Sequence, residues 1–309
     1  MKQSEVLYPR DIRTGMEAMA YTFYRDCPIE TIFILFGVGA NGKSVFTSLL
    51  TALIGPDNTS NLPLSDMSRD LFALSDLQNK DLNIDNELAG KTITDTSILK
   101  KLTGGSRQKI RVQKKYVKAY DIQSHAKLFF NANEMPFSQD KTDAYNRRLT
   151  IISFPIQFEG KRADKDLINK LTTPEELSGI FNILMHCLRT ILKTNEIYAS
   201  VKTIEEKRLK YERTLNPVKS FLEEAILEES TTEDYIPKTD CHNAYMEYCN
   251  EYTLPIQGYN NFCKILKNDF SIAETRKTLD KNKDERVMCW SGLRLVPKYA
   301  PKTAQTTLI

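Results

Sequence analysis

One loop-forming segment constrains the fold of this chain more than any other feature. An apolar run at residues 31–36 leads into a glycine-rich stretch that ends in Lys43 and Ser44, and an apolar-periodic segment follows from Val45. This order matches the phosphate-binding loop G-x-x-x-x-G-K-[ST], which lies between a strand and a helix. Glycines allow close backbone approach to phosphates, and a helix N-terminus adds free N–H groups. The segment therefore predicts a nucleoside triphosphate site with a divalent metal.

Each loop residue has an expected role. We expect Lys43 to reach the β- and γ-phosphates and the Ser44 hydroxyl to ligate Mg²⁺, while the glycines supply permissive dihedrals and close approach. The alternative is a chance glycine turn before a helix, and average residue usage gives odds of about one in a hundred for such a match somewhere in a chain this long. The predicted nucleotide-binding residues are Gly37, Val38, Gly39, Ala40, Asn41, Gly42, Lys43, Ser44 and Val45.

Composition excludes several classes of protein. A length of 309 residues allows two domains, and 41% hydrophobic with 27% charged residues is typical of a globular protein. The sequence contains no run of 18 apolar residues, so we expect no membrane span. It also lacks an N-terminal apolar h-region, so we expect no secretion and a cytoplasmic location. The six cysteines form no C-x-x-C pair and only three histidines occur, which favours reduced thiols over a zinc site. The net charge of +3 is too small to indicate nucleic acid by itself.

Strand-like runs alternate with helical segments through the first half of the chain, which predicts an α/β domain with a parallel sheet ending near residue 158. A helix is expected from Pro9 to about Asp26, and a helix capped by Thr173 over about 173–192. The expected strands are residues 31–36, 81–87, 127–133 and 149–154.

The pattern changes again in the last third of the chain. Charged helical sequence at 200–230 is interrupted at Asn216 and Pro217, and three short helices followed by strands then suggest a small winged-helix domain. The helices are expected at 221–227, 241–252 and 260–270, and the strands at 275–279, 287–290 and 293–296. The expected domains are an N-terminal helical segment (1–28), an ATPase core (29–158), a helical lid or linker (159–215), a winged-helix-like domain (216–300) and a tail (301–309).

Hydrolysis of a triphosphate needs a carboxylate, a group that senses the γ-phosphate and a positive charge. Glu87 ends the second strand and is predicted to orient or deprotonate the attacking water, with Asp85 holding the metal through water. Predicted metal ligands are thus Ser44, Asp85 and Glu87, although polar residues also end strands for purely structural reasons. Asn133 ends the strongest strand and is expected to contact γ-phosphate and water, unless it is only a turn residue. Asn131 is expected to face elsewhere.

Arg147 and Arg148 precede the fourth strand. A guanidinium fits a phosphoryl transition state, so the pair is a candidate arginine finger working in trans across a subunit interface. Exposed arginine pairs are more often only solvated. The predicted catalytic residues are Lys43, Glu87, Asn133, Arg148 and Arg147.

A basic segment lies between the acid and the amide. Residues 100–118 contain eight Lys or Arg and no acid, and alternation at 109–112 predicts a strand of a hairpin with Lys114 and Lys115 near its tip. Cations on a projecting hairpin can follow a phosphate backbone, and Tyr116 is available for base stacking. The alternative is a solvated charged hairpin. The predicted DNA-binding residues are Lys109, Arg111, Lys114, Lys115 and Tyr116.

The order of these motifs resembles superfamily 3 helicases, most of all the helicase part of phage, plasmid and poxvirus-type primase–helicases. The matching segments are Gly-Ala-Asn-Gly-Lys-Ser at 39–44, Glu87, Leu-Lys-Lys-Leu-Thr-Gly-Gly at 99–105, Phe-Asn-Ala-Asn-Glu-Met-Pro at 130–136, Arg-Arg-Leu at 147–149 and Glu-Glu-Leu-Ser-Gly-Ile at 175–180. The resemblance implies an AAA+-like P-loop core, ATP and Mg²⁺ as cofactors, a hexameric ring, and 3′-to-5′ movement on single-stranded DNA. It also implies that Arg148 is the finger, with Arg147 the other candidate.

The chain departs from that pattern in two places. Asp85 and Glu87 are separated by Asn86 where adjacent acids are usual, and no primase catalytic domain is present. We therefore expect a fragment of a longer replication protein with a primase or polymerase domain. The expected partners are single-stranded or forked DNA and further copies of this chain, with no membrane.

The predicted function is an ATP-dependent replicative DNA helicase module. The alternative is a DNA-binding initiator ATPase that melts or remodels DNA without processive unwinding. A DNA-binding assembly subunit with a vestigial ATPase is a third possibility, and the intact Lys43, Ser44, Glu87 and Asn133 argue against it.

Overall fold

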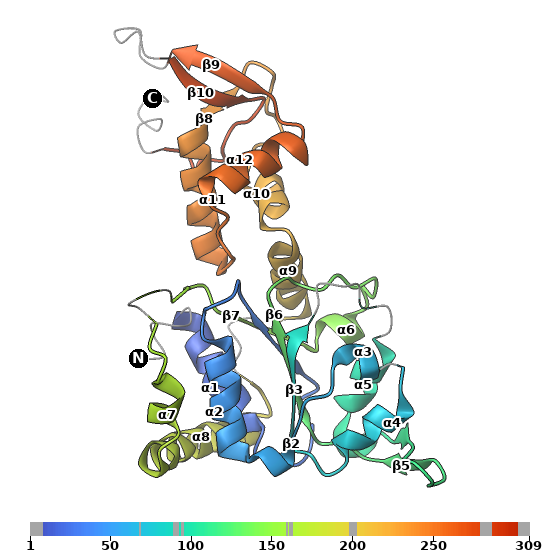
Figure 1. The fold of residues 1–309 in the computed structure, drawn as a ribbon. Coiled ribbons are helices and arrows are strands. Elements are labelled where there is room, and N and C mark those ends of the chain that lie inside the picture. The colour runs from blue at the N-terminus through green and yellow to red at the C-terminus, as the bar shows by residue number, and fades with distance from the viewer. Residues whose placement is uncertain are drawn as a thin grey trace. The chain divides into compact units, whose positions relative to one another are not determined.

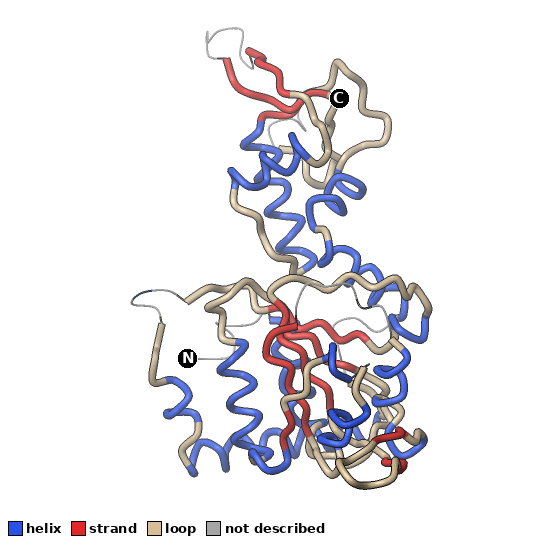
Figure 2. The backbone as a smooth tube through the Cα atoms, turned by 45° about the vertical axis from the view of Figure 1, so that its right-hand side comes forward, coloured by secondary structure: helices blue, strands red, loops and turns tan. Residues whose placement is uncertain are grey.

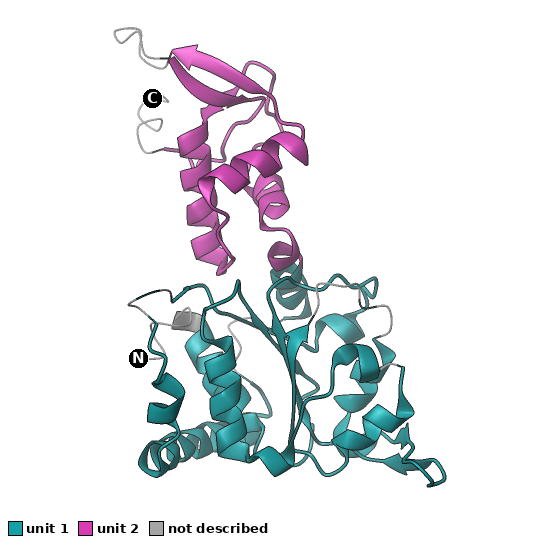
Figure 3. Cartoon of the chain, viewed as in Figure 1, with its two compact units in different colours: residues 1–211 teal, residues 212–309 magenta. Residues whose placement is uncertain are grey.

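The chain forms two compact units in the computed structural model, residues 1–211 and 212–309 (Figure 3). The structure describes residues 9–67, 69–88, 93, 96–158, 160, 163–197, 203–278 and 286–301. Within the described residues, no helix has the length and apolar character needed to cross a lipid bilayer.

A five-stranded parallel sheet forms the centre of the first unit, in the order β2-β3-β6-β1-β7. The prediction of an α/β unit with a parallel sheet is confirmed. Strands β1 and β6 are buried along their whole length, which explains their unbroken apolar sequences. The strands are β1 (Ile32–Phe36), β2 (Thr59–Ser60), β3 (Leu82–Leu88), β6 (Lys127–Ala132) and β7 (Leu149–Ser153).

Helices cover both faces of this sheet, with α1, α2, α7 and α8 on one face and α3, α4 and α5 on the other (Figure 1). Side chains of α1, α2 and α8 pack with those of β1, β3 and β6 in one apolar core that includes Met19, Phe33, Phe46 and Phe129. The helices are α1 (Pro9–Tyr21), α2 (Lys43–Ile54), α3 (Leu64–Met67), α4 (Leu71–Leu74), α5 (Ser97–Leu102), α6 (Asp143–Asn146), α7 (Leu167–Leu171), α8 (Pro174–Thr194) and α9 (Ile204–Leu215). Short 3₁₀ turns lie at Pro56–Asn58, Ser75–Leu77 and Gly105–Arg107.

The ends of two helices test the sequence predictions. Helix α8 begins as expected, because the Thr173 hydroxyl accepts the Glu176 N–H. The prediction that the first helix extends to Asp26 is wrong, since α1 ends at Tyr21. Beyond that point the N–H groups of residues 22–24 bond to carbonyls three residues back, which tightens the chain into turns.

The predicted basic hairpin is present in the first unit. Strands β4 (Ile110–Val112) and β5 (Tyr120–Ile122) pair antiparallel, and the turn between them carries Lys114, Lys115 and Tyr116. The turn lies at the opposite end of the unit from the β1–α2 loop (Figure 1). Its three side chains are exposed, Tyr116 by 93%.

The second unit follows the order helix, strand, helix, helix, strand, strand (Figure 2). Its antiparallel sheet has the order β8-β10-β9, and its core is aromatic, with Phe221, Tyr245, Tyr248, Phe262 and Trp290 fully buried. The elements are α10 (Pro217–Ala225), β8 (Tyr235–Pro237), α11 (Lys238–Tyr252), α12 (Tyr259–Asn268), β9 (Glu274–Thr278) and β10 (Arg286–Ser291).

The strand expected at residues 293–296 is wrong. Gly292 has a φ of 74°, and the chain turns there so that Leu295 forms an isolated bridge with Ile226. Leu293 and Leu295 bury their side chains in the core of the unit, so their apolar pattern reflects burial without a sheet partner. The third strand of the sheet is β8, which the sequence did not indicate. Residue 279, expected to end the strand before the charged turn, lies outside the described residues.

Candidate nucleotide-binding site

The β1–α2 loop lies at the carboxyl edge of the sheet, where ligands of open parallel sheets bind. Strand β1 has β6 on one side and β7 on the other, so the chain order reverses here. The loop takes left-handed backbone at Ala40 (φ 55°) and Gly42 (φ 92°). Gly42 caps α2, and no side chain caps this helix end. The first N–H groups of α2 therefore remain available to an anion.

The three loop glycines differ in what the fold requires of them. A Cβ on Gly37 would lie 2.1 Å from Asn41 Nδ2 and 2.4 Å from the Phe154 carbonyl oxygen, whereas a Cβ on Gly39 would meet no atom of the described residues within 4 Å. Gly37 is thus required by packing and Gly42 by its dihedral. We expected all three glycines to adopt backbone dihedrals that other residues avoid, and only Gly42 does so, with its positive φ. Among the described residues, neither packing nor a positive φ requires a glycine at position 39.

This difference gives a stability prediction. We expect Gly37→Ala to destabilise the unit by about 1–3 kcal/mol, the usual range for an overpacked site, because the Phe154 carbonyl is backbone and cannot move away cheaply. Gly39→Ala is the matched control and should leave the urea midpoint unchanged. Equal midpoints for both variants would contradict the packing argument.

Lys43 joins the loop to the neighbouring strand. Its Nζ donates to Asn41 Oδ1 and to Asn133 Oδ1, each at 3.0 Å, and to the Gly37 carbonyl. Burial lowers the pKa of Lys43. Two residues predicted separately from the sequence, Lys43 and Asn133, are therefore in direct contact.

A cavity of about 480 Å³ opens beside the loop, within the size range of small-molecule sites. Three of the residues that the sequence suggested for the site line it: Ser44, Glu87 and Asn133. Gly37 and Val38 do not line it. The full lining is Gly39, Ala40, Asn41, Gly42, Lys43, Ser44, Val45, Asn86, Glu87, Asn131, Asn133, Phe158, Ala163, Asp164 and Leu167.

The structure corrects the expected position of Asp85. This carboxylate is buried and accepts backbone N–H groups, from Leu64 at Oδ2 (3.0 Å) and from Glu87 at Oδ1 (3.2 Å), and it is not among the cavity's lining residues. The pairing of β3 with β6 shifts register between Asp85 and Leu88. A bulge re-aims the side chains that follow it, which places the adjacent residues Asn86 and Glu87 both at the cavity. Asp85 instead ties β3 to the start of α3.

Asn131, expected to face elsewhere, also lines the cavity. It precedes Asn133 by two positions, and residues two apart in a strand share a face. Its Nδ2 lies 3.4 Å from Asn86 Oδ1, and its buried Oδ1 has no hydrogen-bond partner among the described residues. A buried acceptor of this kind needs a donor or a cation. Strand alternation could have revealed Asn131, whereas nothing in the sequence marked Asn86 or Asp164.

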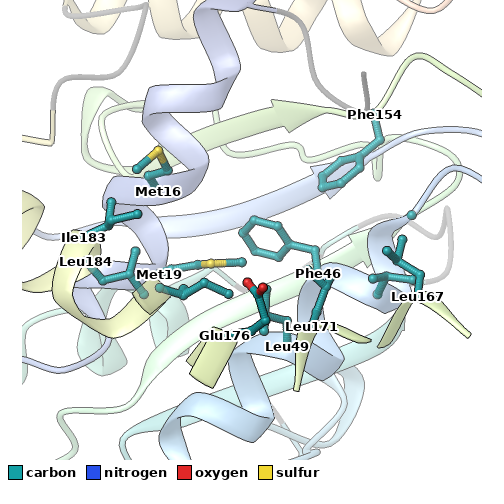
Figure 4. Close-up of a pocket in the computed structure, with 13 residues that line it drawn as sticks. Met16, Met19, Phe46, Leu49, Phe154, Leu167, Leu171, Glu176, Ile183 and Leu184 are labelled. Atoms are coloured by element: carbon teal, nitrogen blue, oxygen red, sulfur yellow. The ribbon is translucent and has the colours of Figure 1, made fainter. Parts of the chain in front are cut away.

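A second cavity, of about 250 Å³, adjoins the first and shares Gly42, Val45 and Leu167 with it. Helices α1, α2, α7 and α8 enclose it, and its walls are apolar except for Glu176. Met19 and Phe46 point toward one another across this cavity (Figure 4).

Arg147 and Arg148 lie at the other edge of the sheet, because β7 runs parallel to β1 and they precede it. Strand β1 has five residues and so separates the two edges by about 15 Å at 3.3 Å per residue. Arg148 is buried and donates to Thr103 Oγ1 (2.9 Å), to the Ala144 carbonyl and to Glu30. Arg147 donates to the same Glu30 at 2.7 Å and remains half exposed. Neither arginine is brought to the loop of its own chain.

The five predicted DNA-binding residues all belong to the hairpin or the residue before it. Lys109 and Arg111 are exposed, and Arg111 pairs with Asp121 across the hairpin at 3.3 Å. Lys115 Nζ lies 5.1 Å from the centre of the Tyr116 ring, a cation–π contact. The hairpin thus presents three lysines, Lys114, Lys115 and Lys118, and an aromatic face to solvent.

Comparison with known proteins gives one family match. Residues 35–148 match a family of unknown function, DUF5906, over a span that contains the loop, Glu87, Asn133 and the arginine pair. Among solved structures, two apo structures of the NrS-1 C-terminal region are similar at 14% identity over 91% of this chain and 71% of theirs, with TM-scores of 0.43 and 0.45. A crystal structure of JCV helicase bound to a substituted acetamide is similar at 14% identity, over 80% of this chain and 67% of that chain, with a TM-score of 0.29.

Proposed function

We propose that this chain binds and hydrolyses ATP with Mg²⁺. The observation that carries the proposal is the meeting of three groups in one cavity: the uncapped start of α2, the Lys43 amine bonded to Asn133, and the Glu87 carboxylate. An anion at the helix start is stabilised by free N–H groups and by the helix dipole. A carboxylate and an amide a short distance beyond such an anion are suited to position a water molecule for attack.

The residues of the cavity fit a magnesium ion. Ser44, Glu87 and the unpartnered Oδ1 of Asn131 are oxygen donors, the type that Mg²⁺ prefers, and they line one cavity. When bound, the ion neutralises charge on the phosphates. In this assignment Glu87 orients the attacking water, Asn133 contacts the γ-phosphate, and Asp85 is left out of the metal site.

The apolar cavity next to the loop suits the nucleobase. It shares Gly42, Val45 and Leu167 with the phosphate cavity, so one ligand can extend from one into the other. Aromatic and aliphatic walls such as Phe46 and Met19 match the apolar faces of a base.

We further propose that the chain uses ATP hydrolysis to unwind DNA, as a replicative DNA helicase module. The support is the exposed basic hairpin together with the motif order of superfamily 3 helicases. In this proposal the core is AAA+-like, several copies form a ring, expected to be a hexamer, and movement on single-stranded DNA is 3′-to-5′. The second unit, with three helices and a three-stranded antiparallel sheet, is proposed to be a winged-helix-like domain of a longer replication protein.

A strand-displacement assay on forked DNA, combined with mass measurement of the assembly, tests this proposal. ATP-dependent displacement by an oligomer supports the helicase module. Duplex melting without processive displacement would point to an initiator ATPase.

The hairpin gives a separate prediction. We expect Lys114→Ala with Lys115→Ala to abolish strand displacement and leave DNA-independent ATP turnover intact, because the hairpin turn lies at the opposite end of the unit from the β1–α2 loop, which lines the cavity (Figure 1). Loss of two phosphate contacts should make the plot of log affinity for single-stranded DNA against log salt shallower by about 1.4. The control removes two exposed lysines from α8 and α10, by Lys193→Ala with Lys219→Ala. Unchanged displacement in the hairpin variant would place the DNA contact elsewhere.

A further inference from the structure

One acidic side chain stands in the wall of the apolar cavity beside the phosphate-binding loop. Four residues of α8 line this cavity, and their spacing of four, three and one positions places them on one face of the helix. Glu176, in the first turn, is the only charged residue that lines the cavity in the described part of the chain. The other three are Ile180, Ile183 and Leu184. A glutamate therefore occupies the first position of an otherwise apolar stripe.

The carboxylate of Glu176 points into the cavity, toward the side chains of Met19 and Phe46 (Figure 4). The backbone N–H of Glu176 donates to the Thr173 hydroxyl at 3.3 Å, so the helix cap does not engage the side chain. Within the residues that the structure describes, this carboxylate pairs with no hydrogen-bond donor and no cation. An ionised carboxylate accepts hydrogen bonds and donates none. The cavity thus contains one acceptor that lacks a partner.

The packing of α8 fixes the position of this carboxylate. Leu184, about two turns further along the same face, is 2% exposed and belongs to the core of the first unit, and Ile180 packs against that core. The first turn also favours a negative charge, because the helix dipole places partial positive charge there. Glu175 shares this turn but does not line the cavity. The carboxylate of Glu176 is therefore held at the cavity by a regular helix, which positions a group more precisely than a loop does.

The neighbouring phosphate cavity indicates which part of a ligand would reach Glu176. The two cavities share three lining residues, among them Gly42, which caps α2. A triphosphate at the start of α2 would therefore place its base in the apolar cavity, with the faces of the base against side chains such as Phe46. Only the edge of the base carries groups that can bond to a carboxylate. On adenine the 6-amino group is the donor on that edge, and the ring nitrogens are acceptors.

We propose that Glu176 accepts a hydrogen bond from the 6-amino group of adenine and thereby selects ATP over nucleotides that carry an oxygen at that position. The proposal rests on the proposed ATPase function and specifies how the same site recognises its nucleotide. In inosine triphosphate (ITP) a carbonyl oxygen replaces the 6-amino group and would face the carboxylate as a second acceptor. Guanosine triphosphate (GTP) carries the same oxygen. A site built to hydrogen-bond an N–H group rejects the analogue that lacks it, because its own polar group is then left unpaired.

The test is nucleotide binding by titration calorimetry with ATP, ITP and GTP, in EDTA so that no hydrolysis occurs. A hydrogen bond to a charged group is worth about tenfold to a hundredfold in affinity. Glu176 is also exposed to solvent, so we expect the lower value, with ATP bound about tenfold more tightly than ITP by the wild type. Glu176→Ala should bring the two affinities within about threefold of one another by weakening ATP.

Glu176→Gln should reduce the preference in a different way. Its amide N–H can donate to the 6-oxygen of ITP, so ITP should bind more tightly to this variant than to the wild type. A merely structural role of Glu176 would not produce that gain. Every substitution at this position keeps the backbone N–H that Thr173 accepts, and thermal unfolding of each variant checks that the fold is kept.

Glu175→Gln is the matched control, because it removes a charge from the same turn without touching the cavity, and it should keep the wild-type ratio of ATP to ITP affinity. A wild type that binds ATP and ITP equally, or a ratio unchanged in both Glu176 variants, would overturn the role of Glu176 and leave the ATP site standing. Tighter binding of GTP than of ATP, lost in both variants, would overturn adenine in favour of guanine, whose N1 and 2-amino groups are donors. A wild type that binds none of the three would overturn the proposed function, and this inference with it.

Discussion

Lys43→Ala is expected to reduce ATP turnover to background while the fold is kept. The Lys43 amine is held by three oxygen acceptors from the loop and from Asn133, so in the proposed function it is the cation that the loop offers to the phosphates. Without it the β- and γ-phosphates lose their charge partner both in binding and in the transition state. The fold should survive, because burial of this charge is unfavourable and its removal relieves that penalty.

Turnover, ATP affinity and thermal unfolding check this prediction together. Lys43→Met is a second variant that keeps the volume of the side chain and removes only the charge, and it should behave as Lys43→Ala does. Lys219→Ala, which removes an exposed lysine from α10, should behave as the wild type. Turnover retained in the two Lys43 variants would refute the assignment of the loop.

Arg147→Ala is expected to lower kcat by about 10³–10⁵-fold, the range known for arginine fingers. The large effect is expected because a half-exposed guanidinium at the edge opposite the chain's own loop can meet a phosphate only across an interface. Binding of ATP to the isolated chain should not change, since Arg147 does not line the cavity.

Arg148→Ala needs a different interpretation. Its side chain is buried and bonded to Thr103, Ala144 and Glu30, so its removal should lower stability as well as turnover. The sequence resemblance selected Arg148 as the finger, but the geometry makes Arg147 the accessible member of the pair. A variant of Arg148 that lost kcat with full thermal stability would restore Arg148 as the finger.

Much of the fold could be predicted from the sequence. The apolar runs of β1, β6 and β7 indicated parallel strands because strands buried on both faces must be apolar throughout, and the glycine-rich loop followed the first of them. The hairpin was indicated by alternation around Arg111. The end of α1 was missed because the apolar spacing continues to Phe23 although the helix ends at Tyr21. Strand β8 was missed because its pairing with β10 depends on residues far along the chain.

The sequence predicted the kinds of side chain at the candidate site better than it predicted which positions supply them. Lys43 bonds to Asn133, and Glu87 lines the same cavity, as the places of Glu87 and Asn133 near strand ends and of Lys43 in the glycine-rich loop suggested. Asn86 lines the cavity in place of the expected Asp85 because β3 shifts register after Asp85. The periodicity of the sequence cannot show such a bulge. Glu30 carried no sequence signal, because a single acid before a strand is common and its arginine partners lie 77, 117 and 118 positions away.

The central claim is that one copy supplies the loop and a second copy supplies the arginine. Steady-state ATP turnover of Arg147→Ala mixed with Lys43→Ala tests this claim most directly, because each variant alone lacks one half of every site. In mixed assemblies some sites combine an intact loop with an intact arginine, so we predict turnover well above the sum of the two separate variants. Turnover should first rise and then fall as the proportion of one variant in the mixture is increased. Turnover equal to that sum, in assemblies shown by mass measurement to contain both variants, would contradict the claim.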